Sequence, residues 1–491
     1  MTDVFDLVVI GSGPAGEKGA AQAAYFGKKV AIVERSSEPG GVVVSDAGVP
    51  TKTLRETALY ITGFKQREVY GLSLNLDPAV TLEALTSRAA DVIAISTQAV
   101  RANIERHGIE LIHGHGSLGP GRRVRVRLAD GGERVLSAGV ILLAPGSRPA
   151  HPAGIPFDDP DVHDSVSILR LDRIPRSLVV VGAGAVGCEY ASIFTALGVR
   201  VTLLDPGPRL LPFADAEASG VLAAAFRAVG MDLRQRARAA LIERAGGLLT
   251  VRLDDGGLLR PEKVLFAAGR RGNTDGLGLG ELGIDLDPAG RIVVDRRFET
   301  TAAGIYAAGD VIGPPALASV SMEQSRVAVC NAFEIPFKDA VDTLAPLGVY
   351  AIPELAMVGM TEEQARAEGI DVETGRAPFA QNTRATISGN TEGFIKLVFR
   401  RDNRQLLGVH IVGEIAGELI HLGQSVLHAG DTIDRFINAT FAVPTHADLY
   451  KYAAYDGLQR MAGRTPRGLR HSAGQLHADG MTPNPPLPAP S

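Results

Sequence analysis

The sequence predicts an α/β protein built from two parallel-sheet units and a third domain of mixed strands and helices. A strand, a glycine-rich turn, a helix and a second strand follow in this order over residues 5–34, and again over residues 178–205. Chance seldom produces the whole unit twice, so the repetition is more specific than either copy alone. Beyond residue 347, alternating strands and amphipathic helices replace the pattern, which favours an α+β domain.

The first unit carries the turn GSGPAG at residues 11–16. Gly11 allows the tight turn, Gly13 lets the backbone approach a pyrophosphate, and Gly16 lets the helix pack closely on the strand. The helix N-terminus stabilises phosphate charge, and Glu34, 23 residues after Gly11, is placed to accept hydrogen bonds from ribose hydroxyls. A glycine motif alone also suits an ordinary strand-to-helix turn, but the flanking strands and the acid favour a dinucleotide site.

The second unit repeats these features with the same spacing. The corresponding residues are Gly182, Gly184, Gly187 and Asp205. Two dinucleotides are therefore expected, and hydride transfer between them is the chemical reason to hold both. Asp205 favours the free 2′-hydroxyl of NAD(H), while Arg209, four residues later, can moderate this preference toward a 2′-phosphate.

Composition sets broad limits. With 491 residues, 45% of them hydrophobic, the chain is long enough to bury several cores and to form about three domains. Its net charge of −5, with both signs mixed, indicates neither nucleic acid nor an anionic membrane as a partner. The first residues lack a signal-peptide pattern, and no apolar run approaches the ~20 residues that span a bilayer. We therefore expect a cytoplasmic protein.

The histidines and cysteines indicate no metal site and no disulfide framework. His113, His115 and His151 lack the spacing of metal ligands and are expected at the surface or in turns. Two cysteines, Cys188 and Cys330, are too few for a framework of disulfides. A helix N-terminus can activate a thiol, but packing against the sheet is the commoner role of a cysteine at these places.

Further motifs are distributed along the chain: GG at 40–41, PTK at 50–52, LRETALYITGF at 54–64, APGSRP at 144–149, GAGAVGCEYASIF at 182–194, AAGRRGNTDGLGL at 267–279, YAAGDVIG at 306–313 and YAIPELAMVG at 350–359. Together with the two glycine turns, they resemble the pyridine nucleotide-disulfide oxidoreductase family over about residues 4–462. Within that family, which includes dihydrolipoamide dehydrogenase, the chain is most similar to the soluble, Si-specific NAD(P)+ transhydrogenase branch.

This resemblance implies two Rossmann-like dinucleotide-binding domains, one for FAD and one for NAD(P)(H), and a C-terminal α+β dimerisation domain. The implied order is an FAD-binding part at 1–150, an NAD(P)-binding domain at 151–276, a return to the FAD-binding domain at 277–346 and the dimerisation domain at 347–465. It also implies a homodimer in which the C-terminal domain of one subunit completes the flavin site of the other. Residues 466–491 are rich in Pro, Gly and Ala, so we expect them to be disordered.

The resemblance also implies roles for individual residues. Lys52 and Glu189 would form an ion pair beside flavin N5, where a positive charge stabilises the electron density of reduced flavin. The alternative is two solvated charges at helix starts. The other implied cofactor contacts, beyond the two glycine turns and their acids, are Gly41, Gly116, Ala144, Gly146, Gly269, Gly309, Asp310 and Ala318. Among these, Gly309 and Asp310 would hold the flavin ribityl and pyrophosphate, and Gly269 the nicotinamide nucleotide.

The chain departs from the family at its thiol chemistry. Val43 and Gly48 occupy the positions of the two redox-active cysteines, so no dithiol relay is possible there. Val443 occupies the position of the catalytic histidine, whereas Asp448 keeps the acid; His446 is expected to be structural or at the surface. Thiol chemistry needs a base, so the two losses agree in arguing against a disulfide substrate.

These observations predict an FAD-dependent oxidoreductase that takes hydride from NAD(P)H onto flavin and passes it to a second nicotinamide, or otherwise to a diffusible acceptor. A first alternative is reduction of a quinone, a dye or a small metabolite in an apolar pocket opened by Val43 and Gly48. A second alternative is a catalytically inert flavoprotein kept as an assembly subunit. The complete second nucleotide unit argues against the inert alternative.

Overall fold

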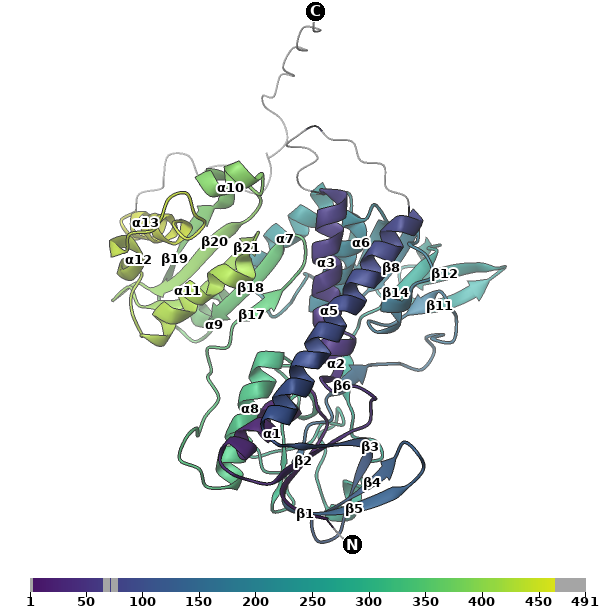
Figure 1. The fold of residues 1–491 in the computed structure, drawn as a ribbon. Coiled ribbons are helices and arrows are strands. Elements are labelled where there is room, and N and C mark those ends of the chain that lie inside the picture. The colour runs from purple at the N-terminus through teal and green to yellow at the C-terminus, as the bar shows by residue number, and fades with distance from the viewer. Residues whose placement is uncertain (1–2, 65–70, 72–77, 464–491) are drawn as a thin grey trace, which may run out of the picture.

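Figure 1 shows the fold in the computed structural model, which describes residues 3–64, 71 and 78–463. Three sheet-containing parts surround the long helices α3 (Val49–Thr62) and α5 (Pro78–Arg106). The tail for which we expected disorder, residues 466–491, lies outside the described residues.

The lower part of Figure 1 is a six-stranded sheet in the order β1-β2-β3-β4-β5-β16, with β1 also paired to β5. Its strands are β1 (Asp3–Ile10), β2 (Val30–Glu34), β3 (Glu110–Gly119), β4 (Arg123–Leu128), β5 (Glu133–Leu143) and β16 (Ile305–Ala307). Strand β1 runs parallel to β2 and β5. Its side chains alternate between two cores, with Val8 and Ile10 in one cluster and Leu7 and Val9 in the other. The strand is thus buried on both faces, as the parallel-sheet prediction requires.

Two helices cover one side of this sheet. They are α1 (Pro14–Tyr25) and α8 (Ala318–Ala332), which pack against one another. Ala20 and Ala328 are fully buried in the same cluster as Leu7, so small side chains allow a close approach of helix and strand. Although α8 follows the second nucleotide unit in sequence, it returns to the first sheet.

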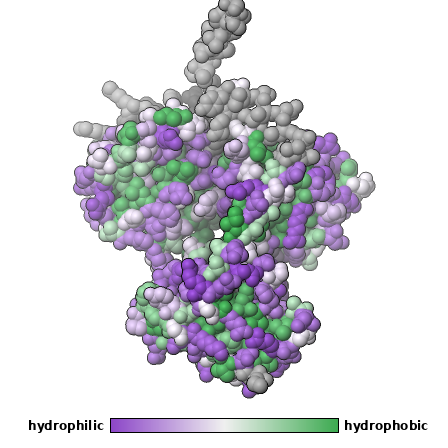
Figure 2. All heavy atoms as spheres, in the orientation of Figure 1, coloured by the Kyte–Doolittle hydropathy of each residue, from purple (hydrophilic) through white to green (hydrophobic). Residues whose placement is uncertain are grey.

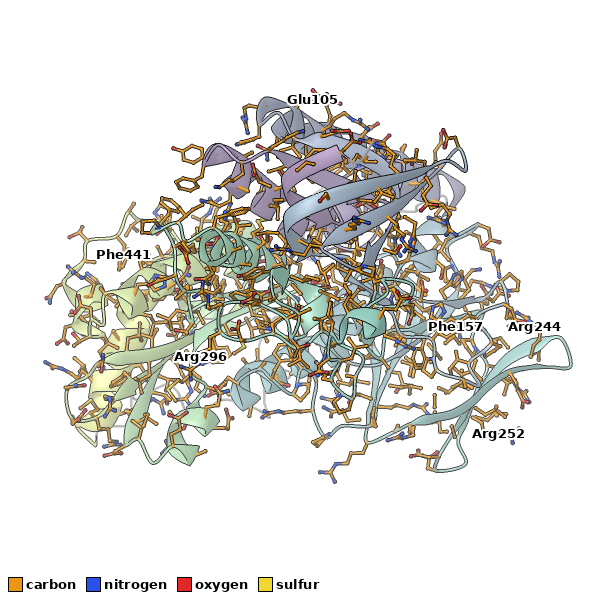
Figure 3. The ribbon with its side chains drawn as sticks, turned by 90° about the horizontal axis from the view of Figure 1, so that it is seen from below. Glu105, Phe157, Arg244, Arg252, Arg296 and Phe441 are labelled. Atoms are coloured by element: carbon orange, nitrogen blue, oxygen red, sulfur yellow. The ribbon has the colours of Figure 1, made fainter. Side chains whose placement is uncertain are left out.

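The second unit is a five-stranded parallel sheet in the order β10-β9-β8-β14-β7. Its strands are β7 (Val162–His163), β8 (Ser177–Val181), β9 (Arg200–Asp205), β10 (Asp232–Gln235) and β14 (Lys263–Phe266). Helices α6 (Ala185–Ala196) and α7 (Ala216–Ala228) pack on it. Strands β11 (Ala239–Ala245), β12 (Leu248–Leu253) and β13 (Leu258–Leu259) form a small antiparallel sheet. Arg244 and Arg252 mark this hairpin at the outer end of the molecule (Figure 3).

The chain enters and leaves the second unit through neighbouring strands. Strand β6 (Ser147–Pro149) pairs antiparallel with β15 (Arg270–Gly272). The amide of Ala150 also donates to the carbonyl of Gly269 at 3.1 Å. The second unit is therefore an insertion into the first.

The third part is a five-stranded antiparallel sheet in the order β17-β18-β21-β20-β19. Its strands are β17 (Leu347–Val349), β18 (Glu354–Gly359), β19 (Val372–Pro378), β20 (Phe394–Arg400) and β21 (Leu406–Gly413). Its helices are α9 (Glu362–Ala367), α10 (Thr383–Ser388), α11 (Ala416–His428), α12 (Asp434–Asn438) and α13 (Leu449–Met461). The three parts confirm the predicted class of two parallel-sheet units and an α+β domain.

None of the helices in the described part of the chain is both long and apolar enough to cross a bilayer. Figure 2 shows hydrophilic residues spread over most of the visible face. Within the same residues, no group of three or more His, Cys, Asp or Glu side chains is arranged to hold a metal ion.

Candidate active site

The first glycine turn joins β1 to α1, with tight packing at Gly11 and Gly16 but only ordinary contact at Gly13. Gly11 has φ +101°, and a Cβ there would lie 2.3 Å from the carbonyl oxygen of Ala144. A Cβ on Gly16 would lie 1.8 Å from the carbonyl oxygen of Gly11. Gly41 approaches from the following segment, where a Cβ would lie 2.7 Å from the Cα of Gly13. Three bare backbone segments thus meet at the N-terminus of α1, which fits a pyrophosphate group.

Glu34 lies at the end of β2, beside this turn. It is 5% exposed, and its Oε2 accepts hydrogen bonds from the amide of Ser12 at 2.8 Å and from the hydroxyl of Ser12 at 2.6 Å. Its Oε1 accepts from the amide of Ser36 at 2.8 Å. The carboxylate therefore also holds the turn together, a role that the sequence reading missed. Its contact with a ribose stays a prediction.

The second glycine turn repeats the geometry of the first. Gly182 has φ +105°, and a Cβ on Gly187 would lie 1.8 Å from the carbonyl oxygen of Gly182. Asp205 accepts hydrogen bonds at 2.7 Å from the amides of Ala183 and Gly207. At Gly184, in contrast, a Cβ would meet no atom within 4 Å. This open space above the N-terminus of α6 is where a second pyrophosphate fits.

Lys52 and Glu189 form the ion pair that the sequence predicted. The Nζ of Lys52 on α3 donates to the Oε2 of Glu189 on α6 at 2.8 Å, although 137 positions separate the two residues. The Glu189 side chain is 8% exposed and that of Lys52 is 36% exposed. A buried glutamate paired with a half-buried lysine rules out the alternative of two solvated charges.

Tyr350, between β17 and β18, is a third member of this site that the sequence reading missed. Its amide donates to the Oε1 of Glu189 at 2.9 Å, and the Nζ of Lys52 lies 5.0 Å from the centroid of its ring. Both oxygens of Glu189 are therefore engaged, and the ring face supports the ammonium group. The third domain thereby fixes a pair built from the other two units. Its place in the YAIPELAMVG motif was the only signal in the sequence.

Asp310 follows β16 and joins a second polar cluster. The hydroxyl of Ser147 donates to the Oδ2 of Asp310 at 2.6 Å, and the Nε of Arg270 donates to the Ser147 hydroxyl at 2.8 Å. Burial lowers the pKa of Arg270, and the neighbouring charge of Asp310 opposes this effect. Ser147 and Arg270 belong to β6 and β15, so the cluster ties the insertion point of the second unit to Asp310. The sequence predicted Asp310 but neither of its partners.

The remaining predicted residues lie in several strands, turns and helix starts of the first two units. Gly309 contacts α1, because a Cβ there would lie 3.1 Å from the Cβ of Ala15. Ala144 follows β5, and Ala318 is the first residue of α8. Gly116 lies within β3, and Gly146 and Gly269 have φ +70° and +124°. No contact in the described structure tests their roles toward a cofactor, so these stay predictions.

Known protein families match the chain over most of its length. The family model described as pyridine nucleotide-disulphide oxidoreductase matches residues 5–325, and the model of its dimerisation domain matches residues 345–454. The chain belongs to the pyridine nucleotide-disulphide oxidoreductase family. It is accordingly an FAD-dependent oxidoreductase that uses NAD(P)(H), and the family's dimerisation domain indicates a homodimer.

Individual relatives span nearly the whole chain. A soluble pyridine nucleotide transhydrogenase of Mycobacterium tuberculosis is 41% identical over 460 residues, which cover 93% of this chain and 98% of the relative. One from Marinomonas is 36% identical over 93% of this chain and 99% of the relative. Among solved structures, LpdA from Mycobacterium tuberculosis has a TM-score of 0.84 at 29% identity and covers 92% of this chain and 99% of its own. The HOCl-induced flavoprotein disulfide reductase RclA from Escherichia coli has a TM-score of 0.82 at 27% identity, with coverage of 92% and 99%.

Val43 and Gly48, the positions that the resemblance assigned to the two cysteines, lie next to one another. Val43 lies on α2 (Gly41–Ser45) and Gly48 caps the start of α3. A Cβ on Gly48 would lie 2.7 Å from the carbonyl oxygen of Val43 and 3.2 Å from its Cγ1. Val43 thus lies directly beside Gly48, and an apolar pocket at these two positions stays a prediction.

The two cysteines, Cys188 and Cys330, are both buried and free. Burial raises the pKa of both thiols, and the neighbouring Glu189 raises that of Cys188 further. Both are therefore protonated at neutral pH, which fits the packing role that the sequence favoured.

The segment that carries the family's histidine position begins near Phe441, at the edge of the third domain (Figure 3). Val443 is 75% exposed in the single chain, and Asp448 accepts a hydrogen bond from the Nδ2 of Asn382 at 2.6 Å. His446 is 7% exposed and packs on Phe379 with ring centroids 5.4 Å apart. Burial lowers the pKa of His446, so it is a neutral core residue. This agrees with a structural role, and position 443 itself carries no histidine.

The other histidines also differ in part from expectation. His113 and His115 lie within β3 and not in a turn, because the strand continues to Gly119 and β4 pairs with its whole second half. His151 contacts Asp164 at 2.7 Å and stacks on Phe157 with centroids 4.0 Å apart. Only His151 is half-exposed and lies in a turn-rich segment, as predicted.

Proposed function

We propose that the chain transfers hydride from NAD(P)H to bound FAD and from there to a second nicotinamide nucleotide, without thiol chemistry. The observation that carries the proposal is an intact Lys52–Glu189 pair next to Val43 and Gly48, two residues with no sulfur. The relatives named soluble pyridine nucleotide transhydrogenase support this activity. That name also supports a cytoplasmic location.

The proposal gives the domains and residues the following assignments. The FAD-binding domain comprises residues 1–150 and 277–346, the NAD(P)-binding domain residues 151–276 and the dimerisation domain residues 347–465. FAD is held by Gly11, Gly13, Gly16, Glu34, Gly41, Lys52, Gly116, Ala144, Gly146, Gly309, Asp310 and Ala318. The nicotinamide nucleotide is held by Gly182, Gly184, Gly187, Asp205 and Gly269.

The residues around Lys52 hold its positively charged ammonium group in place. FAD supplies the site that accepts a hydride and gives it up again. Glu189 and the Tyr350 ring hold the Lys52 ammonium group in one place, so its positive charge is fixed before electrons arrive. No proton needs to move through a base in this exchange, because hydride leaves one nicotinamide and enters another. The absence of a histidine at position 443 is therefore consistent with the activity.

Two half-reactions measured separately test the proposal. Under anaerobic conditions, NADH should bleach the flavin absorbance in a stopped-flow instrument, and a thio analogue of NADP+ should then restore it. Oxidised lipoamide and glutathione should give no turnover. Bleaching that a nicotinamide cannot reverse would refute the transhydrogenase activity.

A panel of other acceptors separates the alternatives. Fast reoxidation by a quinone, with none by either nicotinamide, would show that the diffusible acceptor is not a nucleotide. A flavin that neither NADH nor NADPH bleaches would support an inert flavoprotein. The close packing of Val43 and Gly48 favours neither outcome, so the acceptor panel decides between them.

A further inference from the structure

The proposed activity requires one site to accept both 2′-phosphorylated and unphosphorylated dinucleotides. The groups around Asp205 are therefore expected to set the relative affinity for the two. Each oxygen of Asp205 accepts one hydrogen bond from a backbone amide, that of Ala183 or that of Gly207. The loop that follows turns back over the glycine motif, where the amide of Leu211 donates to the carbonyl of Ala183 at 3.0 Å. This loop therefore borders the adenosine end of the expected nucleotide.

Arg209 is a cation of this loop with donors to spare. One terminal nitrogen donates to the carbonyl of Pro212 at 2.9 Å, which holds the guanidinium against its own loop. The side chain is 34% exposed. A guanidinium has five N–H donors, so most of them remain for an incoming phosphate.

Glu363, from the third domain, lies beside Arg209. Its Oε1 accepts a hydrogen bond from the amide of Ala216, the first residue of α7, at 3.0 Å. The same oxygen lies 3.9 Å from a terminal nitrogen of Arg209. A carboxylate of α9 thus reaches across the domain boundary to the loop that follows β9.

A buried cluster fixes this arrangement. Lys396 on β20 contacts both oxygens of Asp215, at 3.0 and 2.9 Å, and the Oε2 of Glu362 at 2.8 Å. The Lys396 side chain is 2% exposed and that of Asp215 is fully buried. Since Asp215 precedes α7 and Glu362 precedes Glu363, the position of Glu363 beside Arg209 is imposed by domain packing.

We propose that Glu363 is a specificity-determining residue that weakens the binding of 2′-phosphorylated dinucleotides by competing for Arg209. A 2′-phosphate that approaches Arg209 must displace or share its contact with Glu363 and meets the repulsion of that carboxylate. An unphosphorylated dinucleotide presents no anion there and is unaffected. This inference rests on the proposed function, because it explains how one site keeps the two nucleotides exchangeable.

Binding titrations of the oxidised holoenzyme with NADP+ and with NAD+ test the inference without any hydride transfer. Glu363→Gln keeps an acceptor for the Ala216 amide and removes the charge. Since a half-exposed ion pair contributes modestly, we expect it to tighten NADP+ binding about two- to fivefold and to leave NAD+ binding unchanged. Arg209→Gln should weaken NADP+ binding by about tenfold or more, and Glu363→Gln should have no effect in that background.

Glu368→Gln is the matched control, because Glu368 is an exposed acid that follows the same helix and has no ion pair with the Arg209 loop in the described structure. If Glu363→Gln and Glu368→Gln change the ratio of NADP+ to NAD+ affinity equally, the inference is wrong. It is also wrong if Glu363→Gln acts equally with and without Arg209. These outcomes are independent of whether reduced flavin passes hydride to a second nicotinamide, so the two proposals can fail separately.

Discussion

Replacing Lys396 by methionine should loosen the contact between the second unit and the third domain. The ammonium group contacts three carboxylates, those of Asp215, Glu217 and Glu362. After the change Glu217 keeps Arg376, at 2.6 and 2.7 Å, and Glu362 keeps its own arginine partner. Asp215 is left fully buried with only backbone donors. Removing one partner of a buried charge costs about 3–5 kcal/mol, and this is the loss that we expect near pH 8.

The loss should shrink as the pH falls. Burial would raise the pKa of Asp215, but the surrounding positive charge, including Lys396, lowers it in the wild type. Its contribution is therefore present above the unfolded pKa of about 4 and is lost only below it. In Lys396→Met the unpaired carboxyl binds a proton more readily than in the unfolded chain. The difference in stability between the wild type and the variant should thus shrink as the pH falls from about 8 to about 5.

Hydrogen exchange of amides in α7 and β20 measures the opening free energy of this contact locally. Arg366→Gln is the control, because Arg366 pairs with the same Glu362 but is 55% exposed, and its removal should cost at most about 1 kcal/mol. Asp215→Asn combined with Lys396→Met should be less damaging than Lys396→Met alone. A Lys396→Met variant that stays within about 1 kcal/mol of the wild type, or a loss equal at pH 5 and pH 8, would refute the reasoning.

Three further predictions concern the active site. Gly187→Ala should lose both nucleotide binding and thermal stability, because the new Cβ would lie 1.8 Å from a backbone oxygen. Gly184→Ala should lose nucleotide binding alone, because its Cβ would meet no atom within 4 Å. Equal thermal unfolding midpoints for the two variants would contradict this. Lys52→Met should slow flavin reduction by NADH by about 10²-fold or more in stopped flow, and an unchanged rate would remove Lys52 from the chemistry. A Cys188→Ala, Cys330→Ala double variant should keep its NADH-dependent turnover, measured by flavin reoxidation, since both thiols are buried and protonated; loss of turnover with flavin still bound would point to a thiol.

A feature of the fold or the site could be predicted from the sequence when its physical reason lay among residues close by in the chain. The glycine turns were predictable because their reasons are partly local: a Cβ on Gly16 would meet the carbonyl oxygen of Gly11, and Gly11 itself has a positive φ. The pairing of Lys52 with Glu189 was accessible only through resemblance, since 137 positions separate them. Tyr350 escaped prediction because its contribution is a backbone amide, which any residue carries.

The buried cluster at the domain boundary escaped prediction for a different reason. Lys396 stands in the middle of β20 and reads as a solvent-facing residue of a half-exposed strand, yet six of the seven residues of that strand are buried. Two of its partners, Asp215 and Glu217, come from another domain, about 180 positions away. Whether an ion pair is buried depends on which domain surfaces pack together. The spacing of residues along a single sequence does not reveal that packing.

The adjoining strands β6 and β15 have a consequence for engineering. Because Ala150 and Gly269 are hydrogen-bonded neighbours, the ends of the inserted unit leave the host at nearly one point. A foreign module with similarly close termini can replace it without stretching the flavin scaffold. The same closeness makes this junction a natural place to cut and rejoin the gene, provided that the new module keeps acids at the positions of Glu189 and Asp215, which pair with Lys52 and Lys396.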